Sequence, residues 1–382
     1  MKRTIQLLQE FSIPLIAGVL AALAWANLSP ESYHNFVYKE LFEGVNFHFL
    51  VNDIFMVFFF ATAAVEITQA LLPGGDLNPI KKAINPLFAT IGGVLGPAVV
   101  YLALNAVIGA PEYVRGWGIP TATDIALAWL VARFVFGAAH PAVKFLLLLA
   151  VADDAIGLII IAVFYPDPMN PVVPGMLLFV LLGMLAAFLL RKFKVQNYWP
   201  YLIIGGVLSW YGLYSAHLHV ALALVPIIPF LPSDKRETTH LFEADINENS
   251  TLTKFEHDWK LFIDFGLFFF GLSNAGVQFS EIDVPTWLVF CALLFGKTIG
   301  ITLLGSLARL IGFPLPNGMG FKELFTAGVV AGVGLTVALF VATAAFVDTD
   351  IQAAAKMGAL FSAAIAVIAI ALGRVLRIKR IE

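Results

Sequence analysis

Apolar segments long enough to cross a membrane repeat along almost the whole chain. A membrane-spanning helix needs about 20 mostly apolar residues, and charged or Pro- and Gly-rich breaks divide this sequence into runs of about that length. The pattern predicts one polytopic domain, residues 1–382, with about twelve spans. The expected spans are 12–28, 51–72, 86–108, 119–136, 143–165, 172–190, 199–213, 216–231, 261–279, 286–308, 324–346 and 352–374.

The composition points to the same class of protein. The 382 residues are 60% hydrophobic and 13% charged, with a mean hydropathy of +0.87, whereas an average soluble domain is roughly 45–50% apolar and 25% charged. These values predict an all-α integral membrane protein and leave no room for a substantial soluble domain. We therefore expect the lipid bilayer as a partner, and neither an enzyme nor a nucleic-acid-binding protein.

The first residues allow two interpretations. The stretch "MKRTIQLLQEFSIPLIAGVLAALAWANLS" has a basic start, an apolar centre and an "AWA" that is similar to a signal-peptide cleavage site. Because further apolar spans follow at once, we favour an uncleaved first span over a removable signal.

Lysine and arginine residues are distributed unevenly over the predicted loops. With both termini in the cytoplasm, all but four of the 23 lie on the inner side, which is where basic residues concentrate. Lys39 and Arg115 lie outside, and Lys297 and Lys356 fall within spans ten and twelve. An odd number of missed spans would remove this asymmetry, so it supports the count as well as the orientation.

Charged residues also interrupt the apolar runs. An ionised side chain at a helix centre costs about 2.5–3.5 kcal/mol on insertion scales, and such residues mark ion or proton paths. One lysine, Lys297, lies in "CALLFGKTIGITLL". The acidic residues inside or near the ends of apolar runs are Asp53, Glu66, Asp124, Asp153 and Asp154.

Asp153, Asp154 and Lys297 have the charges that an exchanger needs if they meet. Two carboxylates and one ammonium leave one negative charge, which one proton or one monovalent cation can balance. Neighbouring helix positions diverge by about 100°, so one aspartate can pair with Lys297 while the other faces a water-filled cavity. The alternative is a structural salt bridge between spans five and ten, which we disfavour because desolvation often exceeds the Coulombic gain of a buried pair.

Spans four and eleven are predicted to break near the middle of the membrane. "GWGIPTATDIALAW" carries Pro120 and two glycines before Asp124, and "VVAGVGLTVALF" carries Gly332 and Gly334; proline removes a helical donor and glycine lowers helix propensity. Interrupted helices in both halves are typical of transporters built from inverted repeats. A packing face of small residues is the alternative for "AGVGLT".

The ends of such half-helices carry partial charges. Asp124 could offset the positive ends and Lys297 the negative ones. The sequence therefore leaves open whether Lys297 pairs with Asp153 or caps a broken helix.

These stretches resemble the NhaA-type sodium/proton antiporter family. The resemblance implies twelve helices in the bacterial inner (plasma) membrane, with both termini in the cytoplasm and with broken helices that cross. It also implies exchange of Na⁺ or Li⁺ for H⁺, which serves pH and sodium homeostasis. No cofactor is implied, and a homodimer is possible. The similar stretches, in the family's order, are "NDIFMVFF", "IGGVLGPAVVYLALN", "GWGIPTATDIALA", "LLLAVADDAIG", "SNAGV", "GKTIGI" and "AGVGLTVALFVATAAF".

The resemblance also implies roles for individual residues. Asp154 would be the main carboxylate for the cation and the proton, and Asp153 would lie beside it as the counter-ion of Lys297, so that both aspartates form the Na⁺ site. Asp124 and Thr123 would lie at the crossing of the broken helices.

Three further positions match residues that the family associates with pH response. They are Glu66 near the cytoplasmic funnel, His219 in "SAHLHVALA" and Glu256 at the start of span nine. The long inner connection before span nine is expected to be a solvated connector, with a regulatory segment as the alternative. The first outer loop lacks a clear alternating strand-turn-strand pattern, which leaves open whether the family's β-hairpin dimer contact is present.

The mechanism we expect is competition between cytoplasmic Na⁺ and external H⁺ for the same carboxylates, with electrogenic exchange. Two other classes stay open. A cation-coupled organic solute symporter would need a larger polar or aromatic pocket, which the chain does not show clearly. A structural or sensor protein without flux would gain nothing from so many buried charges.

Overall fold

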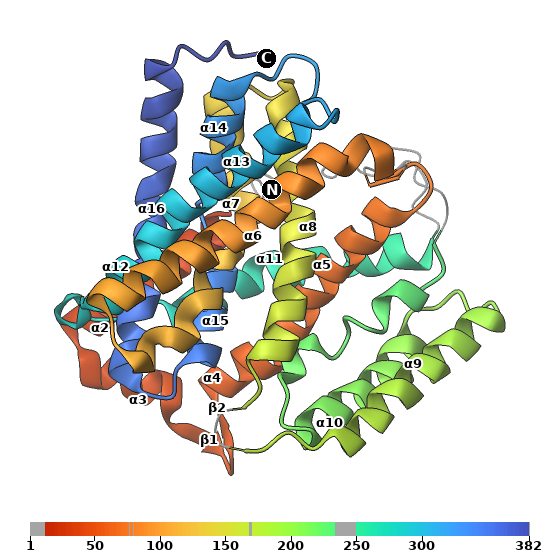
Figure 1. Ribbon diagram of the computed structural model, residues 1–382. Helices are drawn as coiled ribbons and strands as arrows, with labels where there is room; N and C mark the ends of the chain where they lie inside the picture. Colours follow the sequence, from red (N-terminus) through yellow and green to blue (C-terminus); the bar gives the residue numbers. More distant parts are fainter. Residues whose placement is uncertain (1–11, 76, 79, 168–169, 234–249, 382) are drawn as a thin grey trace, which may run out of the picture.

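The computed structural model describes residues 12–75, 77–78, 80–167, 170–233 and 250–381. Over these residues the chain folds into a bundle of α-helices (Figure 1). The helices are α2 Ile13–Leu28, α3 Pro30–Tyr38, α4 Phe47–Phe49, α5 Met56–Leu71, α6 Ile80–Ile108, α7 Ile125–Phe136, α8 Pro141–Phe164, α9 Leu177–Lys192, α10 Val207–Ser215, α11 Thr251–Asn274, α12 Val284–Cys291, α13 Lys297–Leu310, α14 Phe321–Ala331, α15 Thr336–Ala345 and α16 Thr349–Val375.

Short 3₁₀ and π segments join or extend these helices. The π segments continue an α-helix without a break, so that α4 and α5, and likewise α12 and α13, each form one span. The π segments are η1 Leu50–Phe55, η4 Tyr201–Gly206 and η8 Ala292–Gly296; the 3₁₀ segments are η2 Pro111–Thr121, η3 Pro174–Met176, η5 Val220–Leu222, η6 Ile228–Phe230 and η7 Phe279–Glu281.

Within the described ranges, six to eight helical units are long and apolar enough to cross a membrane. Six are single helices, or helices extended by π or 3₁₀ segments. The other two are helix pairs with a short break: η2 and α7 meet at 59°, and α14 and α15 meet at 52°. The protein is therefore a multi-pass helical membrane protein.

Glycines let the long helices α6 and α13 pack closely. A Cβ added at Gly300 of α13 would lie 1.9 Å from the backbone oxygen of Gly92 in α6, and one added at Gly96 would lie 2.2 Å from the oxygen of Gly296. Only glycine fits at such a contact, because any side chain would push the two backbones apart. The contact holds α13 against α6 directly beside Lys297, the first residue of α13.

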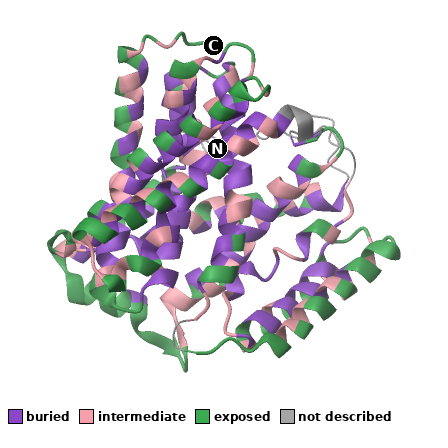
Figure 2. Cartoon of the chain, in the orientation of Figure 1, coloured by how far each residue is buried: buried purple, intermediate pink, exposed green. Residues whose placement is uncertain are grey.

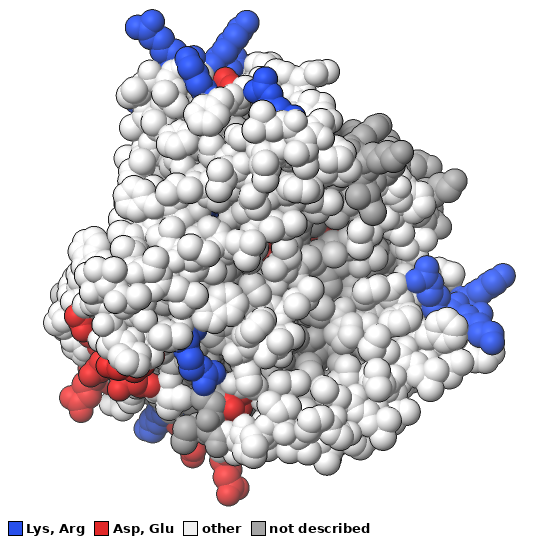
Figure 3. Space-filling model, in the orientation of Figure 1, with Lys and Arg blue, Asp and Glu red and all other residues white. Residues whose placement is uncertain are grey.

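The distribution of buried and charged residues is that expected of a helical bundle in a lipid bilayer. Buried residues line the inner faces of the helices, while many apolar side chains on the outer faces are exposed (Figure 2). On the face shown in Figure 3, basic residues gather at the end where the chain terminates and at the end of α9, while the opposite lower edge carries mostly acidic residues with some basic ones among them.

The predicted span 216–231 is wrong as a continuous helix. The chain there forms turns and the two 3₁₀ segments η5 and η6. Pro226 and Pro229 lack the N–H that a continuing helix requires, and the apolar run is instead packed inside the protein, with Ile227, Ile228 and Leu231 fully buried. The apolar composition of residues 216–231 correctly predicts that this segment is buried. It does not predict whether the buried chain is helical or irregular.

The structure also corrects the start of span nine. Helix α11 begins at Thr251 rather than near 261, because the Ser250 side chain accepts a hydrogen bond from Thr253 N at 3.2 Å and caps the first turn. The polar residues of the first turns were interpreted as loop. Most of the preceding connection, residues 234–249, lies outside the described residues.

The first outer loop forms a short β-hairpin, a point that the sequence pattern left open. β1 Glu40–Phe42 and β2 Val45–Asn46 pair antiparallel, with Gly44 in the turn at φ +74°. The strands are too short to show an alternating pattern, whereas glycine at positive φ supplies the turn.

Candidate functional site

Lys297 and Asp153 form a buried ion pair between α13 and α8. Lys297 Nζ lies 2.5 Å from Asp153 Oδ2, and both side chains are 0% exposed. Thr123, from the break between η2 and α7, completes the cluster: its hydroxyl accepts from Lys297 Nζ at 2.7 Å and lies 2.7 Å from Asp153 Oδ2. The structure thus joins a lysine, an aspartate and a threonine from three separate segments.

Asp154 points to a different environment from Asp153. It is half-buried, and no described residue gives a hydrogen bond to its buried Oδ1. Asp153 Oδ1 is likewise buried without a partner among the described residues. Two neighbouring carboxylates therefore keep free acceptor atoms, and the lysine neutralises only one of them. A buried acceptor without a partner normally has a water, an ion or a proton to satisfy it.

Asp124 contacts one helix of each of the two bent pairs. Its Oδ1 accepts from Leu127 N at 3.1 Å in the first turn of α7, and its Oδ2 accepts from the backbone N and the hydroxyl of Thr336 at 3.3 and 2.9 Å. Thr336 is the first residue of α15. One carboxylate therefore faces the N-termini of two helices, where the backbone carries partial positive charge.

Thr123 offers a hydrogen-bond partner to the C-terminal end of α14. Its hydroxyl lies 3.0 Å from the backbone oxygen of Ala331, the last residue of α14. The hydroxyl has one proton, which goes either to Ala331 O or to Asp153. Lys297 contacts Asp153 and Thr123, not a helix-end carbonyl. The geometry thus favours the Lys297–Asp153 pair over a lysine cap, with Thr123 between the lysine and the end of α14.

The two breaks touch through their backbones. A Cβ added at Gly334 would lie 2.8 Å from Ala122 O, and one at Gly332 would lie 2.7 Å from Leu293 O. Asp124 N also donates to Val333 O at 2.9 Å. The glycines of "AGVGLT" therefore allow close backbone crossing.

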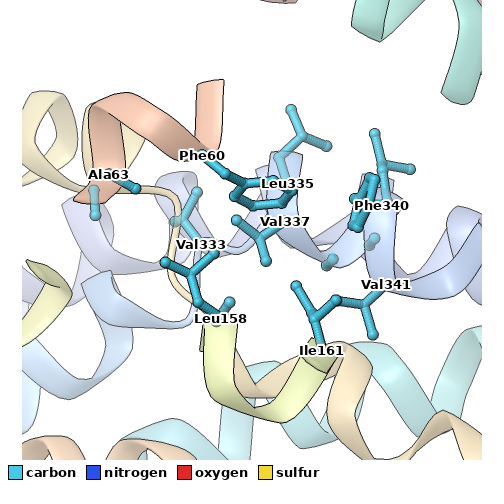
Figure 4. Close-up of a cluster of buried hydrophobic side chains, with 14 of the residues drawn as sticks. Phe60, Ala63, Leu158, Ile161, Val333, Leu335, Val337, Phe340 and Val341 are labelled. Carbon is cyan, nitrogen blue, oxygen red and sulfur yellow. The ribbon is translucent and has the colours of Figure 1, made fainter. Parts of the chain in front are cut away.

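Beyond Asp154, toward the Tyr165 end of α8, the protein is apolar. Leu158 follows Asp154 by four residues, hence on the same helix face, and both Leu158 and Ile161 are buried. Figure 4 shows them facing the loop before α15 and α15 itself, with Phe60 and Ala63 of α5 on the other side. The residues one to two turns beyond Asp154 on α8 are therefore packed among apolar side chains.

The three residues for which the sequence predicts a role in pH response lie on or next to other elements: Glu66 on α5, Glu256 on α11 and His219 directly before η5. Glu66 on α5 is half-buried and interacts electrostatically with Asp154. Glu256 Oε2 accepts from Gln69 Nε2 at 2.6 Å, which joins α11 to α5 one turn beyond Glu66. His219 packs edge-on against Phe340 of α15, with ring centroids 5.6 Å apart.

No group of three or more His, Cys, Asp or Glu side chains within the described ranges is arranged to hold a metal ion.

Sequence reasoning missed two participants in the site. They are Thr336, which follows the break in "AGVGLT", and the backbone carbonyl of Ala331. A threonine directly after a glycine-rich helix break was the available signal, because the first residue of a half-helix presents its N–H to any acidic residue at the crossing.

Comparison with known proteins gives one consistent result. A family model described as "Na+/H+ antiporter 1" matches residues 2–373. Proteins named Na(+)/H(+) antiporter NhaA are similar over the whole chain: that of Desulfitobacterium hafniense is 68% identical over 381 residues, covering 100% of this chain and 98% of the relative. That of Geobacter sulfurreducens is 64% identical, covering 100% of both chains.

Proposed function

Because the chain belongs to the Na+/H+ antiporter 1 family, whose members are transporters and not enzymes, we propose that it exchanges cytoplasmic Na⁺ or Li⁺ for external H⁺ across a bacterial inner membrane. Relatives at 60% identity or more carry the name Na(+)/H(+) antiporter. The cation and the proton are cargo, and the exchange needs no prosthetic group.

One observation carries the assignment of the site. Asp154 has a carboxylate oxygen without a partner among the described residues, directly beside an aspartate that a lysine already neutralises. The pair Asp153–Lys297 is electrically balanced, so Asp154 supplies one uncompensated negative charge. A proton or a Na⁺ ion neutralises that charge, but not both at once. This exclusion is the physical basis of exchange.

The second step involves the ion pair itself. When Na⁺ binds Asp154 it also attracts Asp153, whose Oδ1 has no partner within the described chain. Asp153 then turns from Lys297 toward the cation, and the lysine, left in a dry site, releases its proton. Each cycle would move two protons inward for one Na⁺ outward. Such exchange is electrogenic, and the membrane potential contributes about 2.3 kcal/mol per net charge per 100 mV.

The two broken helices position the residues of this site. We propose twelve spans in inverted repeats, with spans four and eleven interrupted and crossing at mid-membrane. The bends of 59° and 52°, and the shared contact of Asp124 with α7 and α15, support this arrangement. In it Asp124 offsets the positive helix ends, and Thr123 links the negative end of α14 to the Lys297–Asp153 pair.

The charge distribution supports both termini in the cytoplasm. Exposed basic residues near the chain end and at the end of α9 include Arg374, Arg377 and Arg191. Exposed acidic residues at the opposite edge include Glu31 and Glu43. Basic residues favour the cytoplasmic side.

We further propose that Glu66, Glu256 and His219 set the pH range of activity, and that the hairpin takes part in a homodimer. The contact between Gln69 and Glu256 supports the first idea, since it links α11 to the helix that carries Glu66. Exposed Leu41 and Phe42 on β1 support the second.

The proposal can be tested by measuring Na⁺ flux in proteoliposomes with an imposed pH gradient. The wild type is expected to move Na⁺ against the proton gradient, and Asp154→Asn to abolish that movement. Asp53→Asn serves as the matched control, because Asp53 is another half-buried acid to which no role is assigned. Gradient-driven Na⁺ movement that survives Asp154→Asn would disprove the proposed site.

A further inference from the structure

Two buried tyrosines hold the 3₁₀ segment η2 from two different helices. Tyr101 of α6 donates its hydroxyl hydrogen bond to the backbone oxygen of Tyr113 at 2.8 Å. Tyr165, the residue that follows α8, donates to Arg115 O at 2.6 Å and accepts from Gly118 N at 2.8 Å. The exchange cycle as proposed so far uses neither tyrosine.

The two glycines of "GWGIP" make room for these tyrosines. A Cβ added at Gly118 would lie 2.5 Å from the hydroxyl oxygen of Tyr165, and one added at Gly116 would overlap the hydroxyl of Tyr101. Neither glycine adopts a positive φ, so the backbone conformation alone does not require glycine there. The close approach of the two tyrosine rings requires it instead.

The Tyr165 hydroxyl joins two backbone groups that a 3₁₀ helix can pair without help. In a 3₁₀ turn an N–H bonds to the C=O three residues earlier, and Gly118 follows Arg115 by three residues. The hydroxyl is therefore not needed to satisfy these groups, and its effect is to tie η2 to the end of α8. Such a tie matters because η2 has 11 residues, whereas 3₁₀ helices longer than about four residues are uncommon.

The tie lies five residues before Thr123 in the sequence. Residues 118–123 are all buried, and Pro120 fixes one φ angle within them. A closely packed interior transmits a displacement instead of absorbing it. A shift of η2 at the tie therefore reaches the Thr123 hydroxyl, which contacts Lys297 and Asp153.

Helix α8 thus contacts this segment at two places. Asp153 meets the Thr123 hydroxyl at 2.7 Å in the middle of the helix, and Tyr165 meets η2 at the end of the helix. Tyr165 follows Asp153 by twelve residues, which corresponds to about 18 Å along a helix. Two contacts so far apart fix both the position and the direction of the segment relative to the helix that carries Asp154.

We propose that Tyr165 is a positioning residue for the cation site. Its hydroxyl holds η2 against the end of α8, and η2 in turn keeps the Thr123 hydroxyl between Lys297 and Asp153. Without the hydroxyl, the two backbone groups that it joins can still pair with each other, so η2 stays folded but is no longer tied to α8. This inference rests on the proposed antiport, because the cation site is that of the exchange cycle.

The test uses the full-length protein with Tyr165→Phe, which removes the hydroxyl and keeps the ring. Na⁺ binding in detergent, measured by calorimetry, is expected to weaken about two- to tenfold, the equivalent of one hydrogen bond. Hydrogen exchange of the backbone amides in residues 118–123 should become faster, while the thermal unfolding temperature should fall no further than in the control.

The matched control is Tyr33→Phe. Tyr33 of α3 is also buried, and its hydroxyl donates to Leu272 O of α11 at 2.8 Å. The control therefore loses a buried tyrosine hydroxyl of the same kind, and it should keep the wild-type Na⁺ affinity. Gly118→Ala reaches the same change as Tyr165→Phe by another route, because its Cβ displaces the Tyr165 ring, and it should also weaken Na⁺ binding.

Transport in proteoliposomes is the second readout. Tyr165→Phe should raise the KM for Na⁺ and leave the maximal rate close to that of the wild type. Wild-type Na⁺ affinity in Tyr165→Phe overturns the proposal, as does a lower maximal rate at unchanged KM, which would show a purely structural role. A wild type without exchange overturns the antiport itself, whereas Na⁺ binding and hydrogen exchange in Tyr165→Phe still decide on the positioning role.

Discussion

Thr336 donates both its backbone N–H and its hydroxyl to Asp124 Oδ2, at 3.3 and 2.9 Å. The same carboxylate accepts from Leu127 N, so that one side chain caps α7 and α15 at once. The two helices come from segments more than 200 residues apart, and one carboxylate therefore links their first turns. This makes Asp124 a structural as well as an electrostatic part of the crossing.

Replacing Asp124 by alanine should cost about twice as much stability as removing an ordinary cap. Loss of one N-cap costs about 1 kcal/mol, and Asp124 caps two helices. The matched control is Asp348→Ala, which removes the single cap of α16, where Asp348 Oδ1 accepts from Asp350 N and Ile351 N. The shift in thermal unfolding temperature of the purified protein measures both. Equal shifts would contradict the double cap.

The Lys297–Asp153 pair should behave as a coupled unit. Removing one partner leaves a buried unpaired charge, at a cost of about 3–5 kcal/mol, while replacing both partners by apolar groups is often neutral. We therefore expect Lys297→Met to be less stable than the double variant Lys297→Met with Asp153→Leu. Chemical unfolding of the two single variants and the double variant supplies the cycle. Purely additive costs would mean that the two side chains do not interact.

Gly300 should not tolerate even alanine. Its added Cβ would lie 1.9 Å from Gly92 O, so α13 would move away from α6 and carry Lys297 with it. Gly300→Ala should lower the unfolding temperature and weaken Na⁺ binding together. Gly175→Ala is the control, because no atom lies within 4 Å of a Cβ built there. Normal Na⁺ affinity in Gly300→Ala would show that the close contact does not position the lysine.

The hydroxyl of Thr123 should matter more than its methyl group. It contacts Lys297, Asp153 and Ala331 O, and loss of one hydrogen bond costs about 0.5–1.5 kcal/mol. Thr123→Val keeps the shape of the side chain and removes the hydroxyl. The free energy of unfolding should therefore fall by more than the cost of one hydrogen bond, and the pH dependence of Na⁺ binding should shift. Thr123→Ser should remain close to wild type in calorimetric titrations. If Thr123→Val and Thr123→Ser had equal effects, the packing of the side chain, and not its hydroxyl, would be what matters.

The sequence predicted the chemistry of the site better than its geometry. The charges of Asp153, Asp154 and Lys297 within apolar runs were visible because each one is costly in a membrane. Which aspartate the lysine contacts was not visible, since spans five and ten are 144 residues apart and nothing local records their rotation. Residue 153 was assigned to the lysine through family resemblance alone, and the distance of 2.5 Å agrees with that assignment.

By itself the sequence determined that this chain is a helical membrane protein with charges in costly places, because hydropathy and desolvation act on each segment separately. Only the tertiary structure decided that Thr336 shares Asp124 with α7, that Thr123 stands between Lys297 and the end of α14, and that 216–231 folds as turns. These features depend on contacts between distant segments, and hydrogen bonds of that kind leave no periodic signal along the chain.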